Sequence, residues 1–303
     1  MTPAPLLLAG PTAVGKSEVA LILAEQIGGE IVSVDSMQVY RGLDIGTAKP
    51  SAADRARVPH HLVDVADLNE SFDAARFLQL AQVAVKEIHA RGRTPILCGG
   101  TGLYFKAWLE GLGTAPASDP ALRRELESIP QSELLRELSE RDPEAFAKID
   151  KSNPRRIIRA VEVIRLTGRP FSEQRTGWEK PAAAQGIGLS RGADDLKRRI
   201  DARVEAMFRR GLVAETAALL ESGLAANRTA MQALGYRQVA EHLQGKRGLD
   251  ETVELVKVRT RQFAKRQMTW FRRQLHLEWI ELGTGDAADL VVKRILQQLP
   301  RTS

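Results

Sequence analysis

Apolar and polar positions divide the first 110 residues into short hydrophobic runs separated by segments of helical periodicity. The runs are bounded by glycine or polar residues, which predicts buried strands. Segments 18–24 and 72–90 place apolar side chains three or four residues apart, which predicts helices. Strands that alternate with helices in this way favour an α/β fold with a parallel sheet. The predicted strands are Leu6–Ala9, Ile31–Val34, His60–Val65 and Thr94–Cys98.

A more polar segment follows and interrupts this alternation. Residues 113–120 contain Gly, Pro and Ser, which predicts a linker, and residues 177–186 predict a closing loop. We therefore expect residues 113–183 to form a small all-helical insertion. The predicted helices of this insertion are 121–127, 131–141 and 155–167.

The third of these helices has the clearest boundary signals. Asn153 is the expected N-cap, with Pro154 at the first helical position and Gly168 after the last turn. Positive charge at the positive end of a helix dipole is unfavourable unless an anion binds there. The arginines near this helix start therefore favour contact with nucleic acid or diphosphate, and a solvated charged face is the alternative. These arginines are Arg155, Arg156 and Arg159.

The α/β pattern resumes after the insertion with a short strand at 186–189. Helices are expected at 194–211, 212–223, from Gln232 onward, and over 250–273. We therefore assign residues 1–112 and 184–303 to one α/β core. The last of these helices is basic, and its cationic side chains repeat every four residues, which suits a phosphate backbone. They are Lys257, Arg261 and Lys265.

Composition narrows the possibilities further. The net charge of +6 fits either an acidic partner such as nucleic acid or a solvated basic surface. The single cysteine, Cys98, excludes an internal disulfide and a cysteine-based zinc site, and we expect it in the core. No run of about 18 apolar residues and no secretory signal pattern are present. We expect a cytoplasmic protein with no membrane partner.

One stretch after the first predicted strand matches the phosphate-binding motif G-x-x-x-x-G-K-[ST]. In this motif the glycines and the following helix N-terminus turn backbone N–H groups toward an anion. The lysine reaches the outer phosphates, and the final hydroxyl, here Ser17, is a candidate ligand for Mg²⁺. The sequence therefore predicts a polyphosphate or diphosphate ligand. The residues are Gly10, Pro11, Thr12, Ala13, Val14, Gly15, Lys16 and Ser17.

Two further residues are expected near this loop. Asp35 follows a predicted strand, at the edge of the sheet where ligands bind in open α/β folds, although an aspartate capping a turn is the alternative. The strand that carries the acidic residue in phosphate-loop ATPases instead ends here in Gly99, Gly100 and Thr101, so Asp35 is the nearest substitute. The Thr101 hydroxyl reaches the same centre or caps the next helix.

Together these stretches resemble the family of bacterial tRNA dimethylallyltransferases, the isopentenyl-diphosphate:tRNA isopentenyltransferases. The resemblance extends from residue 10 to residue 272, and the stretches 35–50 and 264–272 are its most specific parts. It implies a P-loop NTPase-like parallel sheet flanked by helices, with an inserted helical domain. The matching stretches are Gly10–Ser17, Asp35–Pro50, His60–Asp64, Gly99–Tyr104, Asn153–Arg156, Gly235–Arg237 and Ala264–Arg272.

The resemblance also implies a reaction. A dimethylallyl group moves from dimethylallyl diphosphate to the exocyclic N6 amine of the adenosine 3′-adjacent to the tRNA anticodon, and diphosphate leaves. Asp35 is implied as general base, and Thr101 as the residue that orients the substrates. Arg237 is our candidate for holding the diphosphate, with an arginine of the insertion as the alternative. The implied contacts with the tRNA anticodon stem-loop are Asp35, Ser36, Met37, Gln38, Thr101, Arg123, Arg155, Arg156, Ile157, Ile158 and Arg159.

Two other functions fit part of the pattern. A small-molecule or nucleotide kinase shares the phosphate-binding loop and the parallel sheet. A non-catalytic RNA-binding module would bind RNA in a salt-dependent way without needing Asp35 or Thr101. We expect a monomer that binds Mg²⁺, tRNA and dimethylallyl diphosphate.

Overall fold

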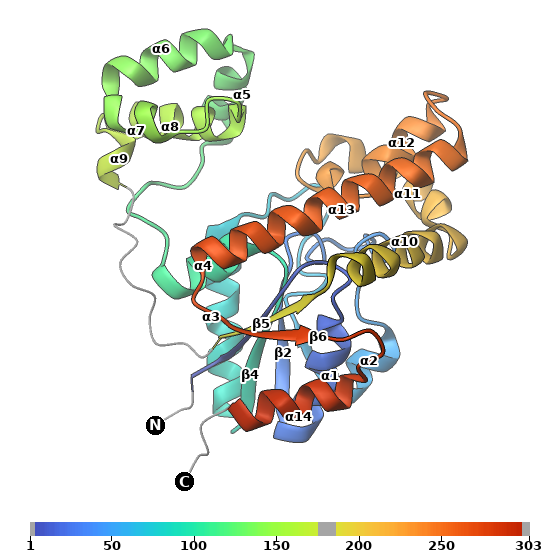
Figure 1. The fold of residues 1–303 in the computed structure, drawn as a ribbon. Coiled ribbons are helices and arrows are strands. Elements are labelled where there is room, and N and C mark those ends of the chain that lie inside the picture. Colours follow the sequence, from blue (N-terminus) through green and yellow to red (C-terminus); the bar gives the residue numbers. More distant parts are fainter. Residues whose placement is uncertain (1–3, 175–185, 299–303) are drawn as a thin grey trace. The chain divides into compact units, whose positions relative to one another are not determined.

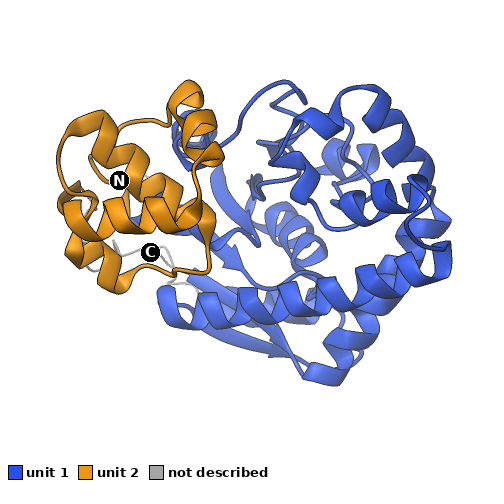
Figure 2. Ribbon diagram, turned by 90° about the horizontal axis from the view of Figure 1, so that it is seen from above, with its two compact units in different colours: residues 1–109, 182–303 blue, residues 110–181 orange. Residues whose placement is uncertain are grey.

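The structure of the chain, a computed structural model, describes residues 4–174 and 186–298. It separates into two compact units, one made of Met1–Leu109 with Ala182–Ser303 and the other of Glu110–Pro181. Figure 2 distinguishes these units by colour. Each unit has its own hydrophobic core, so each is described by itself.

The larger unit is built on one parallel six-stranded sheet with the order β3-β2-β4-β1-β5-β6. The predicted α/β fold is therefore confirmed. The loop that follows β1 lies at the middle of the carboxyl edge of the sheet, where open α/β sheets bind their ligands. The strands are β1 (Leu6–Ala9), β2 (Gly29–Val34), β3 (His60–His61), β4 (Thr94–Gly99), β5 (Gly186–Arg191) and β6 (Glu278–Leu282).

Alternate strand residues face the two sides of this sheet. On one side, Leu8 and Ile96 pack with α1 (Lys16–Ile27) and α14 (Ala288–Gln298). On the other side the neighbouring residues pack against most of the remaining helices of the unit, among them α3 and α4 in Figure 1. These are α3 (Ala74–Ala90), α4 (Gly102–Glu110), α10 (Ala193–Arg209), α11 (Leu212–Glu221), α12 (Tyr236–Leu243) and α13 (Leu249–Gln274), with 3-10 turns at Leu224–Ala226 and Ala230–Gln232. The short helix α2 (Ala52–Arg57) instead contacts α1.

The basic stripe of α13 is only partly available for a ligand. Lys257 Nζ lies 2.8 Å from a Glu205 carboxylate oxygen, and Arg261 Nε lies 2.8 Å from Asp201. Both acidic residues belong to α10, which packs against α13. The stripe therefore joins two helices, and contact of Lys257 and Arg261 with a phosphate backbone stays a prediction.

The smaller unit is helical, and its best-marked helix is α8. Asn153 Oδ1 caps it by accepting from the N–H of Arg156, and Gly168 ends it in the left-handed conformation at φ 71°. Both boundary predictions are confirmed. The helices are α5 (Pro120–Ser128), α6 (Gln131–Arg141), α7 (Pro143–Lys148), α8 (Pro154–Thr167) and α9 (Phe171–Gln174).

Some predicted elements differ from the structure. The strand expected over His60–Val65 ends at His61, because Leu62 and Asp64 have positive φ angles of 61° and 58° and turn the chain. This turn brings the Asp64 carboxylate to Lys49 and Arg55. The pattern did not predict α7, α9, β6 or α14. The loop expected at 177–186 lies almost wholly outside the described residues.

Candidate active site

The phosphate-binding loop connects β1 to α1 in a conformation that requires glycine. Gly15 has φ 111° and precedes the first residue of α1. A Cβ added to Gly10 would lie 2.7 Å from the Leu189 carbonyl oxygen on β5, so the loop passes too close to that strand for a side chain. These two positions explain why the motif needs glycines at its first and sixth residues.

Two arginines hold the outside of this loop. Arg191 Nε, on β5, donates to the Val14 carbonyl at 2.8 Å. Arg199 Nε, on α10, donates to the Ala13 carbonyl at 3.0 Å. The loop carbonyls are thus turned toward guanidinium groups, which leaves its inner side to donors and cations that suit an anion.

Lys16 is the main cation of the site. Its ammonium group donates to the Pro11 carbonyl at 2.7 Å. The pKa of Lys16 is lowered to about 8, chiefly by burial and to a smaller degree by the charge of Arg203, while Cys98 and Asp35 act in the opposite direction. A desolvated lysine beside a second cation is stabilised by an anion. The electrostatics therefore favour a negatively charged ligand here.

Asp35 lies directly after β2 and is fixed by its own turn. Its Oδ1 accepts from the N–H groups of Met37 and Gln38 at 2.8 and 3.2 Å. The N–H of Ser36 donates to Thr101 Oγ1 at 3.1 Å, which joins this turn to the end of β4. The structure thus brings Asp35 and Thr101, two residues predicted for the site, to the same edge of the sheet.

Gln38 has a structural task in this arrangement. Its Oε1 accepts from Ser33 Oγ at 2.9 Å, and its Nε2 donates to the carbonyls of Thr47 and Ala48 at 3.2 and 3.3 Å. It therefore ties the loop after Asp35 back onto β2.

Two residues of the site were not singled out from the sequence. Gln267, on α13, accepts from the Thr12 N–H at 2.9 Å and donates to the Gly100 carbonyl at 2.9 Å. Arg203 is on α10. Burial lowers its pKa, and the charge of Asp35 opposes this shift only in part. Gln267 stood in a stretch already matched to the family, whereas Arg203 carried no motif signal.

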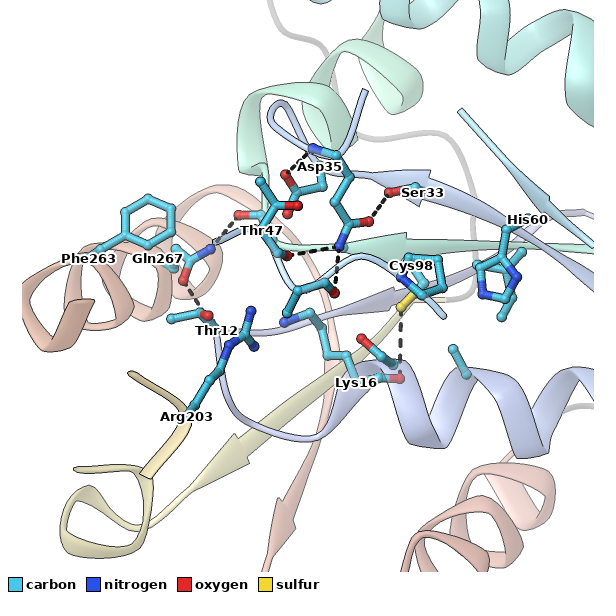
Figure 3. Close-up of a pocket in the computed structure, with 18 residues that line it drawn as sticks. Thr12, Lys16, Ser33, Asp35, Thr47, His60, Cys98, Arg203, Phe263 and Gln267 are labelled. Carbon is cyan, nitrogen blue, oxygen red and sulfur yellow. Dashed lines mark hydrogen bonds between the residues drawn. The ribbon is translucent and has the colours of Figure 1, made fainter. Parts of the chain in front are cut away.

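These residues surround three adjoining cavities at the carboxyl edge of the sheet. A central cavity of about 110 Å³ contacts Lys16, Asp35 and Arg203, which Figure 3 shows around one space. A second cavity, of about 640 Å³, lies along the outer part of the phosphate-binding loop and shares Lys16, Ser17 and Arg203 with the first. A third, of about 420 Å³, shares Asp35 and Arg203 and reaches Thr101 and Phe263.

Arg237 lies away from these cavities. It is on α12, its side chain is 66% exposed, and its Nε donates to Glu241 at 3.2 Å. It lines none of the three cavities, whereas Arg203 lines all of them. The cation that the geometry offers to an anion beside Lys16 is therefore Arg203.

The other predicted RNA contacts belong to the unit Glu110–Pro181. Ile157 and Ile158 are buried in its core, so their side chains are unavailable to RNA. Arg159 is bound to Glu162 at 2.9 Å. Burial and the nearby charge of Arg123 lower the pKa of Arg155, so these two arginines form a cationic pair that suits a phosphate.

Within 4–174 and 186–298, no three His, Cys, Asp or Glu side chains gather as they would around a metal ion. In the same ranges, no helix combines the length and hydropathy that a bilayer-spanning segment requires.

The sheet order, the loop after its central strand and the cationic cavity define an α/β protein with a P-loop NTPase-like fold. Comparison with known proteins agrees. A family model described as IPP transferase matches residues 38–274. The chain belongs to this family.

Individual relatives are similar over most of their length. The tRNA dimethylallyltransferase 1 of Citrifermentans bemidjiense is 48% identical over 281 residues, which cover 91% of each chain. The crystal structure of a tRNA isopentenylpyrophosphate transferase from Bacillus halodurans has a TM-score of 0.70 and 39% identity, covering 97% of this chain and 96% of that one. A eukaryotic dimethylallyltransferase acting on tRNA has a TM-score of 0.81 and 26% identity, covering 99% of this chain and 81% of that one.

Proposed function

We propose that this protein is a tRNA dimethylallyltransferase. It transfers the dimethylallyl group of dimethylallyl diphosphate to the N6 amine of the adenosine 3′-adjacent to the anticodon and releases diphosphate. The observation that carries this proposal is the position of Asp35, which lines both the cationic central cavity beside the phosphate-binding loop and a further cavity that suits the acceptor base. The names of the relatives support both classes of substrate, a dimethylallyl donor and a tRNA acceptor.

The donor diphosphate binds along the phosphate-binding loop. Its charge is matched by loop N–H groups, Lys16 and Arg203, all of which border the second cavity. Ser17 is exposed on the same wall, and a single hydroxyl ligand fits Mg²⁺, which keeps several waters and binds chiefly through substrate phosphates. When bound, Mg²⁺ supplies further neutralisation of the leaving diphosphate.

Transfer then requires the adenine amine and the allylic carbon to meet beside Asp35. The amine nitrogen bonds to the first carbon of the prenyl group as that carbon's bond to the diphosphate oxygen breaks. Asp35 accepts the proton that the amine loses, and Lys16 and Arg203 stabilise the charge that develops on the leaving group. Thr101, held against Ser36, orients the substrates.

The acceptor base enters through the third cavity. A base stacked in the anticodon loop cannot reach Asp35, so it must turn out of the stack. Met207, Leu234 and Phe263 give this cavity apolar and aromatic walls, and Ser36 and Met37 form its rim beside Asp35. We assign Arg123, Arg155 and Arg156 of the other unit to the phosphates of the stem-loop, and we propose that the protein acts as a cytoplasmic monomer.

The test is label transfer from radiolabelled dimethylallyl diphosphate to an unmodified tRNA anticodon stem-loop. Asp35→Asn, which keeps the shape of the side chain but cannot accept the proton, should lower turnover by about a thousandfold while donor binding stays near normal. The matched control is Asp194→Asn, an exposed position on α10.

Near-normal turnover of Asp35→Asn would remove the general base from the proposal. Hydrolysis of ATP to ADP without RNA, together with no label in the stem-loop, would replace the proposed function with that of a kinase.

A further inference from the structure

The central cavity runs along one face of β2. Ile31, Ser33 and Asp35 all line it, and alternate residues of a strand point to the same side. Two residues of a parallel strand span about 6.6 Å, so these side chains mark three levels over about 13 Å. Asp35 is at the reacting end, and Ile31 is the lining residue of β2 farthest from it.

Residues of neighbouring elements line the levels of Ser33 and Ile31. In the sheet register Cys98 of β4 is opposite Ser33, and His60 of β3 is opposite Ile31. Ala20 of α1 lies over the same face, and all these residues line the cavity. Ile31 is only 4% exposed, so the deepest level is a packed wall rather than an opening.

The deeper levels are also uncharged. Burial raises the pKa of the Cys98 thiol to about 11, so it stays neutral. Burial lowers the pKa of His60, whose Nδ1 donates to the Val58 carbonyl, so its ring is neutral at physiological pH. The Ser33 hydroxyl is satisfied by Gln38. Charge is therefore confined to the end with Lys16, Asp35 and Arg203, and at the levels of Ser33 and Ile31 an uncharged lining with the side chains of Ala20, Ile31 and Cys98 is open to a short hydrocarbon group.

We propose that Ile31 forms the end wall of the prenyl subsite and limits the donor to five carbons. This inference rests on the proposed function and adds the determinant of donor length. A dimethylallyl group attached at the Asp35 level fills the space down to Ser33 and Cys98. A ten-carbon geranyl chain needs the next level as well, which the Ile31 side chain occupies.

The test compares dimethylallyl diphosphate with geranyl diphosphate as donors to the same stem-loop. The measured quantity is the ratio of kcat/KM for geranyl to that for dimethylallyl transfer. In the wild-type protein we expect this ratio to be below about one tenth. Ile31→Ala should raise it by about tenfold or more, because the pocket is lengthened where the longer chain must go. Ile31→Val removes one methyl group and should raise it less.

Ile96 provides a matched control. It is paired with Ile31 on the next strand and is also buried, but it does not line the cavity. Ile96→Ala and Ile96→Val should therefore lose comparable stability and leave the donor ratio within about twofold of wild type. Thermal melts identify any variant that fails to fold. If an alanine variant fails to fold, the donor ratio is compared in Ile31→Val and Cys98→Ala instead.

The results separate the two proposals. Absence of dimethylallyl transfer by the wild-type protein would refute the proposed function. Normal dimethylallyl transfer with an unchanged ratio in folded Ile31 variants would refute only the end wall. An equal rise of the donor ratio in the Ile96 variants would also refute the end wall. So would a wild-type protein that uses both donors equally well.

Discussion

The pKa of Lys16 leads to a quantitative prediction for donor binding. In the ligand-free site burial lowers this pKa to about 8, well below the ordinary value of 10.5. A bound diphosphate stabilises the ammonium group and raises the pKa again. Binding is therefore linked to protonation, and affinity is highest below the ligand-free pKa and falls as the pH rises through it.

The size of the effect follows from the protonated fraction of Lys16. With a pKa of about 8, this fraction falls from about three quarters at about pH 7.5 to about one tenth at about pH 9. The dissociation constant for dimethylallyl diphosphate should therefore rise about eightfold, equivalent to about 1.2 kcal/mol of binding free energy. The assay is calorimetric titration of the donor at both pH values without RNA.

Lys16→Arg is the matched control for this experiment. A guanidinium group stays charged throughout the window, so affinity should be nearly independent of pH. Any ionisation of the donor itself appears in both proteins and cancels in the comparison. The same pH dependence in both proteins, or a flat profile in the wild type, would refute the assignment of Lys16 as the titrating contact.

Three further predictions concern residues of the site and a contact that supports it. Gln267→Leu removes the partner of the Thr12 N–H and the Gly100 carbonyl, and we expect kcat/KM for transfer to fall about tenfold. The control is Gln262→Leu, at an exposed position on the same helix. Equal activities of the two variants would contradict a role for the hydrogen bonds that Gln267 makes to Thr12 and Gly100. Tyr236→Phe removes a hydroxyl that donates to Glu215 at 2.6 Å and accepts from the Gly46 N–H at 3.1 Å, so the free energy of unfolding in urea should fall by about 1–2 kcal/mol, and an unchanged midpoint would count against this contact. Ser17→Ala should raise the Mg²⁺ concentration for half-maximal transfer severalfold without changing Tm, because the hydroxyl is exposed, and an identical Mg²⁺ titration would exclude it as a ligand.

Local signals carried the successful sequence predictions. The phosphate-binding loop needs glycine where the backbone turns at Gly15 or approaches β5 at Gly10, and both requirements lie within eight residues. The start of α8 depends on Asn153 and the residues directly after it. Capping and turn preferences act over a few residues, so a single sequence displays them.

Other parts of the site depend on residues far apart in the chain. Gln267 meets Thr12 across 255 positions, and no local pattern records such a contact. Arg237 carried a motif and Arg203 did not, yet Arg203 on α10 lines the cavities, whereas Arg237 on α12 is exposed. The end of β3 was missed for a related reason, since the turn at Leu62 serves an ion cluster formed by Asp64 with Lys49 and Arg55.

The hydrogen bonds that hold the phosphate-binding loop from later parts of the chain have a consequence for biosynthesis. Residues 10–17 leave the ribosome early, but the side chains that hold their carbonyl and N–H groups come from Arg191, Arg199 and Gln267. A nascent chain therefore contains the whole loop motif long before it can bind a prenyl donor. The ability to bind the donor should arise only near the end of translation. A chain that ends before α13 should therefore not bind the donor, even if its amino-terminal strands have formed.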